Sequence, residues 1–339
     1  MKIAIHHQRG SYSQSWIDYC IKNNISYKIV NCYESDIISK LGDCDALMWH
    51  HSHSDPKDVL FAKELLFSVE AAGKLVYPDS RSTWHFDDKL GQKYLMEAMG
   101  LPLVPAYAFY DKTEALKWVE NAEFPLVFKL RGGAGGRNVR LLRSRQQARR
   151  IIKKAFGRGI RQYDAIGGIK DKIRRYRLGL SPAKEVIKAF LHLVYPIRLE
   201  KSKGRDKGYV YFQKFIPGCD TDIRVQLVGD RSWAMIRKVR ENDFRASGSG
   251  NIDFDMSKVP MDAIELSVMV ARKLGMQSLA IDLLPYNGGY GIVEISYAFG
   301  IDEEELEFGY CDGNLIWHPG HINPFGWMID DLIKKYNNG

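Results

Sequence analysis

Residues 1–82 alternate short apolar, strand-like runs with longer stretches whose apolar positions follow a helical period. The strand-like runs include "KIAIHH", "ALMWHH" and "KLVYP", and the clearest helical stretch is "PKDVLFAKELLFSVEAAG". Alternation of this kind is typical of βαβ units, which build a parallel sheet. We therefore predict an N-terminal α/β domain over residues 1–82.

The rest of the chain predicts two α+β lobes, so the expected fold class is α/β and α+β. Residues 83–208 begin with a helix closed by Gly100 and continue with the strand "PLVFKL", a glycine-rich loop and a basic helix. Within this lobe, residues 157–208 have poor periodicity and are interpreted as a basic insertion. Residues 209–339 contain several strands, a helix from Met261 to Leu274, a closing hairpin and an aromatic tail.

The composition is that of a globular protein, with 45% hydrophobic and 27% charged residues. The chain has no run of eighteen apolar residues, and its start lacks the apolar core of a secretory signal. Its five cysteines include no CxxC pair, which favours reduced thiols in a cytoplasm over disulfides or a zinc site. We therefore expect a cytoplasmic protein without a transmembrane segment.

The net charge of +8 is concentrated in one segment. Residues 143–208 contain 20 Lys and Arg against 5 Asp and Glu, a net of +15, which leaves −7 for the remainder. A solvated basic insertion is one interpretation of this segment. The alternative is contact with an anionic polymer or a lipid-linked substrate, and nucleic acid is the less favoured partner because no RNA-binding signature accompanies the charge.

The loop "KLRGGAGGRN" contains Gly132, Gly133, Gly135 and Gly136 directly after Lys129. Closely spaced glycines let backbone N–H groups turn toward a bound anion, although a flexible hairpin tip has the same composition. A strand follows the loop, whereas a dinucleotide fingerprint opens a helix, and the chain has no P-loop motif. The pattern therefore indicates a glycine-rich hairpin that can fold over phosphates.

The closing hairpin joins "LAIDLLPY" to "YGIVEIS" through the predicted three-residue turn at residues 287–289. That turn places Asp282 directly opposite Glu294, with Ser296 on the same face because side chains repeat every two residues. Two carboxylates and a hydroxyl are oxygen ligands that suit Mg²⁺. Neutralisation by an arginine such as Arg224 is the alternative interpretation.

The order of these pieces resembles the ATP-grasp superfamily, and most closely the branch that contains ribosomal-protein glutamate ligases. The matching motifs are "DDK", "FK" with its glycine hairpin, "YFQKFIPGCDTDIR", "IDLL" and "VEIS". The resemblance spans about residues 84–300. It implies an ATP-grasp fold, in which an N-terminal parallel α/β domain precedes two α+β lobes that grip ATP.

The resemblance also implies roles for individual residues. Lys89 and Lys129 correspond to the lysines that hold the nucleotide phosphates, and residues 132–136 correspond to the lid over them. The remaining nucleotide contacts are Gln213 and Ile216 in the hinge strand "QKFI", where Gln213 replaces a glutamate that contacts adenine, and Asp220 at the ribose. Asp282 and Glu294 correspond to the Mg²⁺ ligands, and Ser296 stands where the family usually has asparagine.

The implied reaction is a carboxylate–amine ligation. ATP phosphorylates a carboxylate, and an amine then attacks the acyl phosphate to form an amide, releasing ADP and phosphate. Arg224, Lys238 and Arg245 are the candidates for contacting the transferring phosphate, as basic side chains do in phosphoryl transfer. A kinase on the same fold and a nucleotide-binding module with reduced catalysis are the alternatives.

Two features bear on the acceptor substrate. His50, His51 and His53 follow a parallel strand, at the edge where open α/β sheets bind ligands, although surface histidines without a role would look the same. The tail motif "WHPGH" after "EIS" is similar to ATP-grasp proteins of bacterial surface-polysaccharide clusters. That resemblance implies the amidation of a sugar acid by a small amine or amino acid.

Overall fold

The computed structural model describes residues 1–133, 138–161, 169, 172–173, 176, 182–194, 204–240 and 243–338. The chain divides into two compact units. The first unit contains Met1–Phe86, Leu95–Pro102 and Cys219–Gly339, and the second contains Asp87–Tyr94 and Leu103–Gly218. The three domain ranges expected from the sequence remain predictions.

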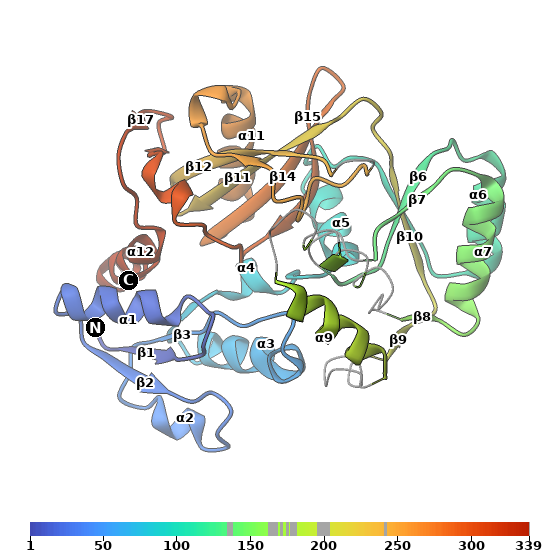
Figure 1. The fold of residues 1–339 in the computed structure, drawn as a ribbon. Helices are drawn as coiled ribbons and strands as arrows, with labels where there is room; N and C mark the ends of the chain where they lie inside the picture. Colours follow the sequence, from blue (N-terminus) through green and yellow to red (C-terminus); the bar gives the residue numbers. More distant parts are fainter. Residues whose placement is uncertain are drawn as a thin grey trace. The chain divides into compact units, whose positions relative to one another are not determined.

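The first unit begins with the predicted parallel sheet, whose strand order is β2-β1-β3-β4 (Figure 1). Its strands are β1 (Ile3–His6), β2 (Tyr27–Val30), β3 (Ala46–Met48) and β4 (Leu75–Tyr77). Its helices are α1 (Ser13–Lys22), α2 (Ile37–Lys40), α3 (Pro56–Ala71) and α4 (Ser80–Thr83). The alternation of strand and helix along the sequence therefore predicted this sheet correctly.

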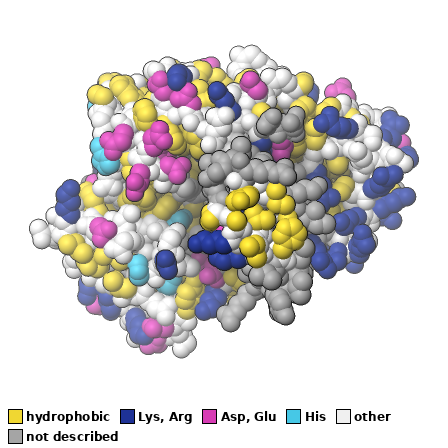
Figure 2. Space-filling view, in the orientation of Figure 1, with side chains coloured by type: hydrophobic (Ala, Val, Ile, Leu, Met, Phe, Trp, Pro, Cys, Tyr) yellow, Lys and Arg dark blue, Asp and Glu magenta, His cyan; other side chains and the backbone are white. Residues whose placement is uncertain are grey.

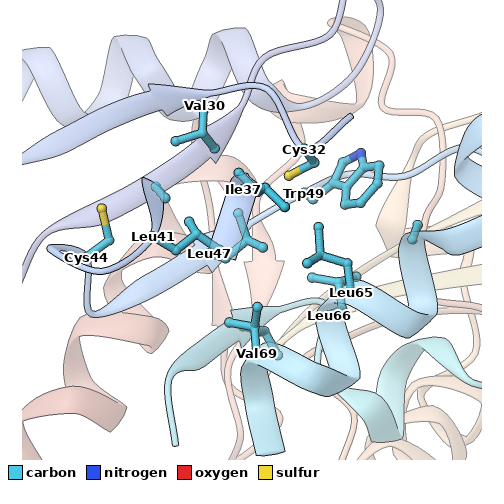
Figure 3. Packing of buried hydrophobic residues seen from close by; sticks show 13 residues of the cluster. Val30, Cys32, Ile37, Leu41, Cys44, Leu47, Trp49, Leu65, Leu66 and Val69 are labelled. Atoms are coloured by element: carbon cyan, nitrogen blue, oxygen red, sulfur yellow. The ribbon is translucent and has the colours of Figure 1, made fainter. Parts of the chain in front are cut away.

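Helix α3 shows why this part of the sequence folds as it does. Asp55 caps the helix by accepting a hydrogen bond from the Lys57 N–H, and Pro56 occupies the first helical position, where its missing N–H costs nothing. Apolar residues then recur at helical spacing. Figure 3 shows Leu65, Leu66 and Val69 of α3 pointing toward the sheet, where they pack in one buried cluster with Leu47 and Trp49.

The first unit also contains a larger, seven-stranded sheet, whose main path is β15-β14-β11-β12-β16-β17. Its strands are β11 (Thr221–Val228), β12 (Arg231–Lys238), β13 (Ile252–Asp253), β14 (Ser278–Tyr286), β15 (Gly289–Ser296), β16 (Tyr310–Cys311) and β17 (Trp317–His318). Helix α11 (Met261–Leu274) contacts β11, β12, β14 and β15 and covers one face. The sequence predicted these helix ends, and Gly275 closes the helix in a left-handed conformation with φ +64°.

Hydrogen bonds join the two sheets of the first unit. The Gln277 side chain accepts from the Asp79 N–H at 2.8 Å and donates to the Val76 carbonyl at 2.9 Å. The Tyr77 hydroxyl donates to Ser278 Oγ at 2.7 Å. The C-terminal helix α12 (Pro324–Asn338) packs against α1 (Figure 1). Short 3-10 turns occur at Met256–Lys258 and Glu304–Glu307.

The second unit is built on an antiparallel sheet of order β5-β10-β6-β7, with helices on one face. Its strands are β5 (Ala106–Phe109), β6 (Leu126–Lys129), β7 (Arg140–Leu142), β8 (Ile160–Arg161), β9 (Arg205–Asp206) and β10 (Val210–Lys214), of which β8 and β9 form a separate pair. Helices α6 (Lys112–Asn121) and α7 (Arg145–Phe156) pack on Phe128 and Phe212. Helix α5 (Lys89–Ala98) runs from this unit into the first, and α9 (Ala183–Val194) lies in the basic insertion.

Within the described ranges, none of the helices combines the length and the apolar character that crossing a membrane requires. All five cysteines are free thiols, and four of them are buried.

Candidate active site

The hairpin that carries the two predicted carboxylates differs from the predicted one at its turn. Tyr286 pairs with Gly289, so the turn has two residues, Asn287 and Gly288, and both have positive φ (52° and 79°). The prediction of a three-residue turn is therefore wrong. Counting back from this pair, a regular ladder would set Asp282 opposite Val293 instead of Glu294.

A bulge in β15 restores the predicted pairing. Leu283 pairs with Ile292 and Asp282 pairs with Glu294, so Val293 is the extra residue. Ile292 and Ile295 are both fully buried although they are three residues apart, a spacing that a regular strand would direct to opposite faces. The bulge brings both isoleucines to the face covered by α11 and leaves Glu294 on the other face, beside Asp282.

Two arginines contact Asp282 on this face. Arg224 donates to both carboxylate oxygens, at 2.7 Å from Nε and 3.0 Å from Nη2, and Arg237 Nη2 lies 3.0 Å from Oδ1. Burial alone would raise the pKa of Asp282, but the two guanidinium groups outweigh it and hold the pKa well below its usual value. The neutralisation that the sequence left as an alternative is therefore present in the structure.

A second carboxylate, Asp222, holds Arg237 from the other side. Arg237 donates to both Asp222 oxygens at 2.7 Å and is only 4% exposed. Burial raises the pKa of Asp222 despite Arg237. Arg224, Asp282, Arg237 and Asp222 thus form an alternating chain of charges. Sequence reasoning assigned no role to Asp222 or Arg237. The ladder places both on this face, because Arg224 pairs with Met235 and each of the two residues lies two positions from one member of that pair.

The oxygen groups on this face fit a magnesium ion that is bound together with phosphate. The arginines make three contacts with Asp282, whose carboxylate has about four acceptor positions, so one position remains for a metal. The three carboxylates Asp222, Asp282 and Glu294 carry a formal charge of −3, and the two arginines carry +2, so these five side chains together have a net charge of −1. The described residues include no cluster of three or more Asp, Glu, His or Cys suited to a metal. Mg²⁺ ordinarily takes one or two carboxylates and completes its shell with phosphates and water.

Ser296 presents an oxygen on the same face, one pleat away from Glu294. Its hydroxyl donates to the Ala298 carbonyl at 2.5 Å, and its ladder partner is Ala280. Because the proton is engaged with the backbone, the oxygen retains lone pairs that can accept a hydrogen bond or bind a metal. A role for Ser296 in metal binding remains a prediction.

The structure gives the three residues predicted to contact the transferring phosphate different surroundings. Arg224 lies beside Asp282, as described above. Lys238 is exposed and lies on the α11 side of the sheet, because neighbouring residues of a strand alternate and Arg237 takes the other face. Arg245 is held by Asp243, whose oxygens lie 3.0 Å from its Nε.

In the second unit, Lys129 and Gln213 share the sheet face that α6 and α7 leave uncovered. Lys129 pairs with Tyr211 and Gln213 pairs with Val127, whereas Phe128 and Phe212 point into the helix-covered core. Lys129 is 6% exposed. The Gln213 amide donates to the Val104 carbonyl at 3.3 Å, which orients the side chain.

The start of the glycine hairpin is anchored by residues at the beginning of α5. Lys89 Nζ donates to the Gly133 carbonyl at 2.9 Å, and the Gly133 N–H donates to Asp87 Oδ1 at 2.7 Å. Asp88 accepts from the first N–H groups of α5 and from Arg131, at 2.5 Å. Sequence reasoning quoted both aspartates in the motif "DDK" but assigned them no role, although an aspartate before a predicted helix is a recognisable capping signal.

The predicted lid is only partly described. A Cβ added to Gly132 would lie 2.9 Å from Asp87 Oδ2, so the close approach of the loop to Asp87 favours glycine there. Gly135 and Gly136 lie outside the described residues. Ile216 follows β10 in the same unit and is half-buried. Asp220 belongs to the first unit, is exposed, and accepts a backbone hydrogen bond from Val239 at 2.8 Å.

Two of the three predicted substrate histidines are part of the packing of the first unit. His50 stacks on Tyr12 at 3.6 Å between ring centroids and accepts from the Tyr12 N–H at 3.1 Å. His51 is 3% exposed, with Nε2 2.6 Å from Thr83 Oγ1. Burial lowers the pKa of His50 to about 3 and that of His51 well below its usual value. Both rings are therefore neutral at physiological pH, and of the three histidines only His51 is buried, whereas His50 and His53 are half-buried.

Comparison with known proteins finds a family model that matches the part of the chain carrying this geometry. Residues 203–310, which include the three carboxylates and the two arginines of the site, match the RimK-like ATP-grasp domain. The whole chain is similar in structure to an ATP-grasp RimK domain protein from Sphaerobacter thermophilus, with a TM-score of 0.57, 14% identity, and 98% of this chain and 100% of that chain covered. The chain has the ATP-grasp fold.

Other proteins similar to this chain are ligases or synthases. D-alanine–D-alanine ligase from Bacillus anthracis superimposes with a TM-score of 0.55 at 14% identity, covering 100% of both chains. The α-aminoadipate–LysW ligase LysX from Saccharolobus solfataricus is 22% identical over 231 residues, 68% of either chain. N5-carboxyaminoimidazole ribonucleotide synthase from Mycobacterium tuberculosis is 31% identical over 118 residues, 34% of this chain and 26% of that one. The predicted ATP-grasp fold is confirmed, and the predicted RimK-like resemblance is confirmed for residues 203–310.

Proposed function

We propose that this ATP-grasp protein is an ATP- and Mg²⁺-dependent ligase that joins a carboxylate to an amine and releases ADP and phosphate. The observation that carries the proposal is the pairing of Asp282 with Glu294 across the β14–β15 ladder, with Arg224 and Arg237 beside them. Alternating acids and bases on one sheet face suit a reaction in which phosphate charge has to be held and moved.

Asp282 and Glu294 would hold the metal, with Ser296 as a third oxygen. Mg²⁺, when bound, offsets the charge of the phosphates during transfer. The net charge of −1 on this face supports a divalent cation, and the two arginines support a site that takes the cation together with an anionic nucleotide. Arg224 uses Nε and Nη2 for Asp282, so the protons on Nη1 point elsewhere and are suited to contact a transferring phosphoryl group.

Nucleotide binding is assigned to the residues that the sequence singled out. Lys89 and Lys129 are buried cations, and Lys89 is already positioned at the base of the glycine hairpin. The remaining members of this proposed set are Gly132, Gly133, Gly135, Gly136, Gln213, Ile216 and Asp220. Gln213 is suited to read an adenine edge because its amide carries both a donor and an acceptor.

We further propose a sugar acid as the carboxylate substrate. This part rests on the tail resemblance alone, in which "WHPGH" follows "EIS". In the structure the tail histidines are paired: His318 Nε2 lies 2.9 Å from Asp312, and His321 Nδ1 lies 2.8 Å from Glu307. His50 and His53 are both half-buried, but the His50 ring is stacked on Tyr12, so His53 is the member of the histidine group best suited to a substrate contact.

The test is ADP release from the full chain with Mg²⁺ and a panel of uronic acids, each with and without a set of amines and amino acids. We expect release to require both the acid and the amine, and heavy-oxygen label in the acid to appear in the released phosphate. Release that needs no amine and yields a stable phosphorylated product would instead identify a kinase.

A matched pair of variants tests the site itself. Glu294→Gln removes a proposed metal ligand, whereas Glu304→Gln removes an exposed carboxylate in the 3-10 turn outside the site. We expect loss of activity in the first variant and normal activity in the second. Unchanged turnover in Glu294→Gln would show that the metal assignment is wrong.

A further inference from the structure

The second unit has a surface that the proposed ligase reaction does not use. Helix α7 exposes Arg145, Arg149, Arg150 and Lys153, and the turn and strand that follow it expose Arg158 and Arg161. We call these six side chains the basic surface. The opposite side of helix α7, which includes Ala148 and Ile152, packs into the core of the unit, so the cations of the helix point outward.

The basic surface is poorly neutralised. Helix α7 contains no acidic residue, even in its first turn, where the helix dipole favours one. Glu120 forms ion pairs with two of the six cations: its Oε1 lies 2.5 Å from Arg149 Nη2, and its Oε2 lies 3.8 Å from Arg145 Nε. No ion pair within 4.0 Å is seen for the other four among the described residues. An ordinary solvated helix face intersperses both signs of charge, so this excess favours an anionic partner.

Helix α9 exposes apolar side chains in the same unit. Ile187 is 61% exposed and Phe190 is 51% exposed, and their spacing of three places them on one side of the helix. Lys184 and Lys188 are exposed on the same helix. Figure 2 shows hydrophobic side chains over α9 and Lys and Arg over α7 and β8 on the same face of the molecule.

We propose that this face of the second unit docks on an anionic lipid bilayer. The side chains of Ile187 and Phe190 enter the boundary between headgroups and acyl chains, and the basic surface lies against the negative headgroups. A nucleic acid would also attract the cations, but its phosphates offer no apolar phase for an aliphatic side chain such as Ile187. The proposal concerns where the protein works and does not depend on the ligase reaction.

The test is co-sedimentation of the full chain with vesicles of phosphatidylcholine alone and of phosphatidylcholine mixed with phosphatidylglycerol. We expect binding to the mixed vesicles only, and weaker binding as salt is raised, because exposed charges are screened beyond about 8 Å at physiological ionic strength. Equal binding to neutral vesicles, or none to either, would overturn the proposal.

Matched variants separate the two contributions. Arg150→Glu with Lys153→Glu should weaken vesicle binding by at least roughly five-fold for each cation removed. The control is Lys273→Glu with Lys335→Glu, which makes the same change in charge at exposed lysines of α11 and α12 and should leave binding unchanged. Equal loss in both double variants would mean that net charge, and not this surface, governs binding.

The apolar part is tested by Ile187→Ser with Phe190→Ser, against Val59→Ser with Leu60→Ser, an exposed apolar pair on α3. We expect the first pair to lose vesicle binding and the second to retain it, with unchanged circular dichroism in both. If the α9 variant binds vesicles normally, or if RNA or heparin binds the wild type and the α9 variant equally and competes fully with vesicles, the partner is a soluble polyanion and the proposal is wrong.

Discussion

A buried carboxylate at the base of the active-site face, Glu305, gives a quantitative prediction about pH. Glu305 is 2% exposed and accepts hydrogen bonds from Gln226 Nε2 at 2.6 Å, Trp233 Nε1 at 3.0 Å and the Asp302 N–H at 2.6 Å. Burial raises the pKa of Glu305 from 4.5 to about 7, with Asp302 adding repulsion, and the three donors only partly offset it.

The sign and size of the effect follow from this pKa. The folded chain holds the Glu305 proton more tightly than the unfolded chain, so the associated stability is fully present below pH 4.5 and is lost as pH rises to about 7. The full loss is roughly 3 kcal/mol, of which about 2.5 kcal/mol falls between pH 5 and pH 8. Above that range the contribution of Glu305 is constant.

The perturbation is Glu305→Gln, which cannot ionise. Its amide meets the same three donors with a single oxygen, so at pH 5 we expect it to be less stable than wild type by about 1–3 kcal/mol. At pH 8 the deficit should vanish or reverse, because only the wild type then carries a buried charge.

The assay is urea unfolding of wild type, Glu305→Gln and Glu304→Gln across this pH range. The exposed control Glu304→Gln should follow the wild type. If the free energy of unfolding of Glu305→Gln runs parallel to that of wild type, the carboxyl does not titrate in this range and the reasoning is refuted.

Three further predictions address other contacts. Arg237→Ala leaves the buried Asp282 and the half-buried Asp222 without their shared cation and should cost about 3–5 kcal/mol in urea unfolding, part of which Asp222→Asn recovers in the double variant; additive losses would argue against the bridge. Ser296→Ala should raise the Mg²⁺ concentration needed for half-maximal ADP release by about ten-fold, and an unchanged Mg²⁺ titration would exclude the hydroxyl as a ligand. Gln277→Ala removes two hydrogen bonds between the sheets of the first unit and should cost about 2–4 kcal/mol, so a loss under about 1 kcal/mol would contradict that role.

The β14–β15 hairpin shows which features of the active site could be predicted from the sequence pattern. The pairing of Asp282 with Glu294 was predicted correctly, but from a three-residue turn that the structure does not contain. The pairing depends instead on a two-residue turn and a bulge at Val293. Burial favours the two-residue turn with a bulge, because this arrangement lets both Ile292 and Ile295 pack on the face covered by α11. The position of α11 is known only from the tertiary structure.

The strand face that Arg237 takes could not be predicted from the sequence either. Strand alternation separated Arg237 from Lys238 without indicating which of them faces the carboxylates. The face covered by α11 is the apolar one, so Arg237 turns to the other face and Lys238 stays exposed near the end of the strand. The histidines follow the same logic, since His51 looks available in the sequence but is closed in by Thr83 and Tyr297.

The sequence by itself determined what depends on neighbours along the chain. Capped helices such as α3 and α11, the parallel alternation of the first 82 residues and the ordered nucleotide motifs all rest on local spacing and backbone preference. The tertiary structure decided what depends on partners far apart in the chain. Arg224 and Arg237 meet Asp282, and Asp222 meets Arg237, because three strands are aligned side by side, and a buried charge takes the partner that packing brings within hydrogen-bond distance.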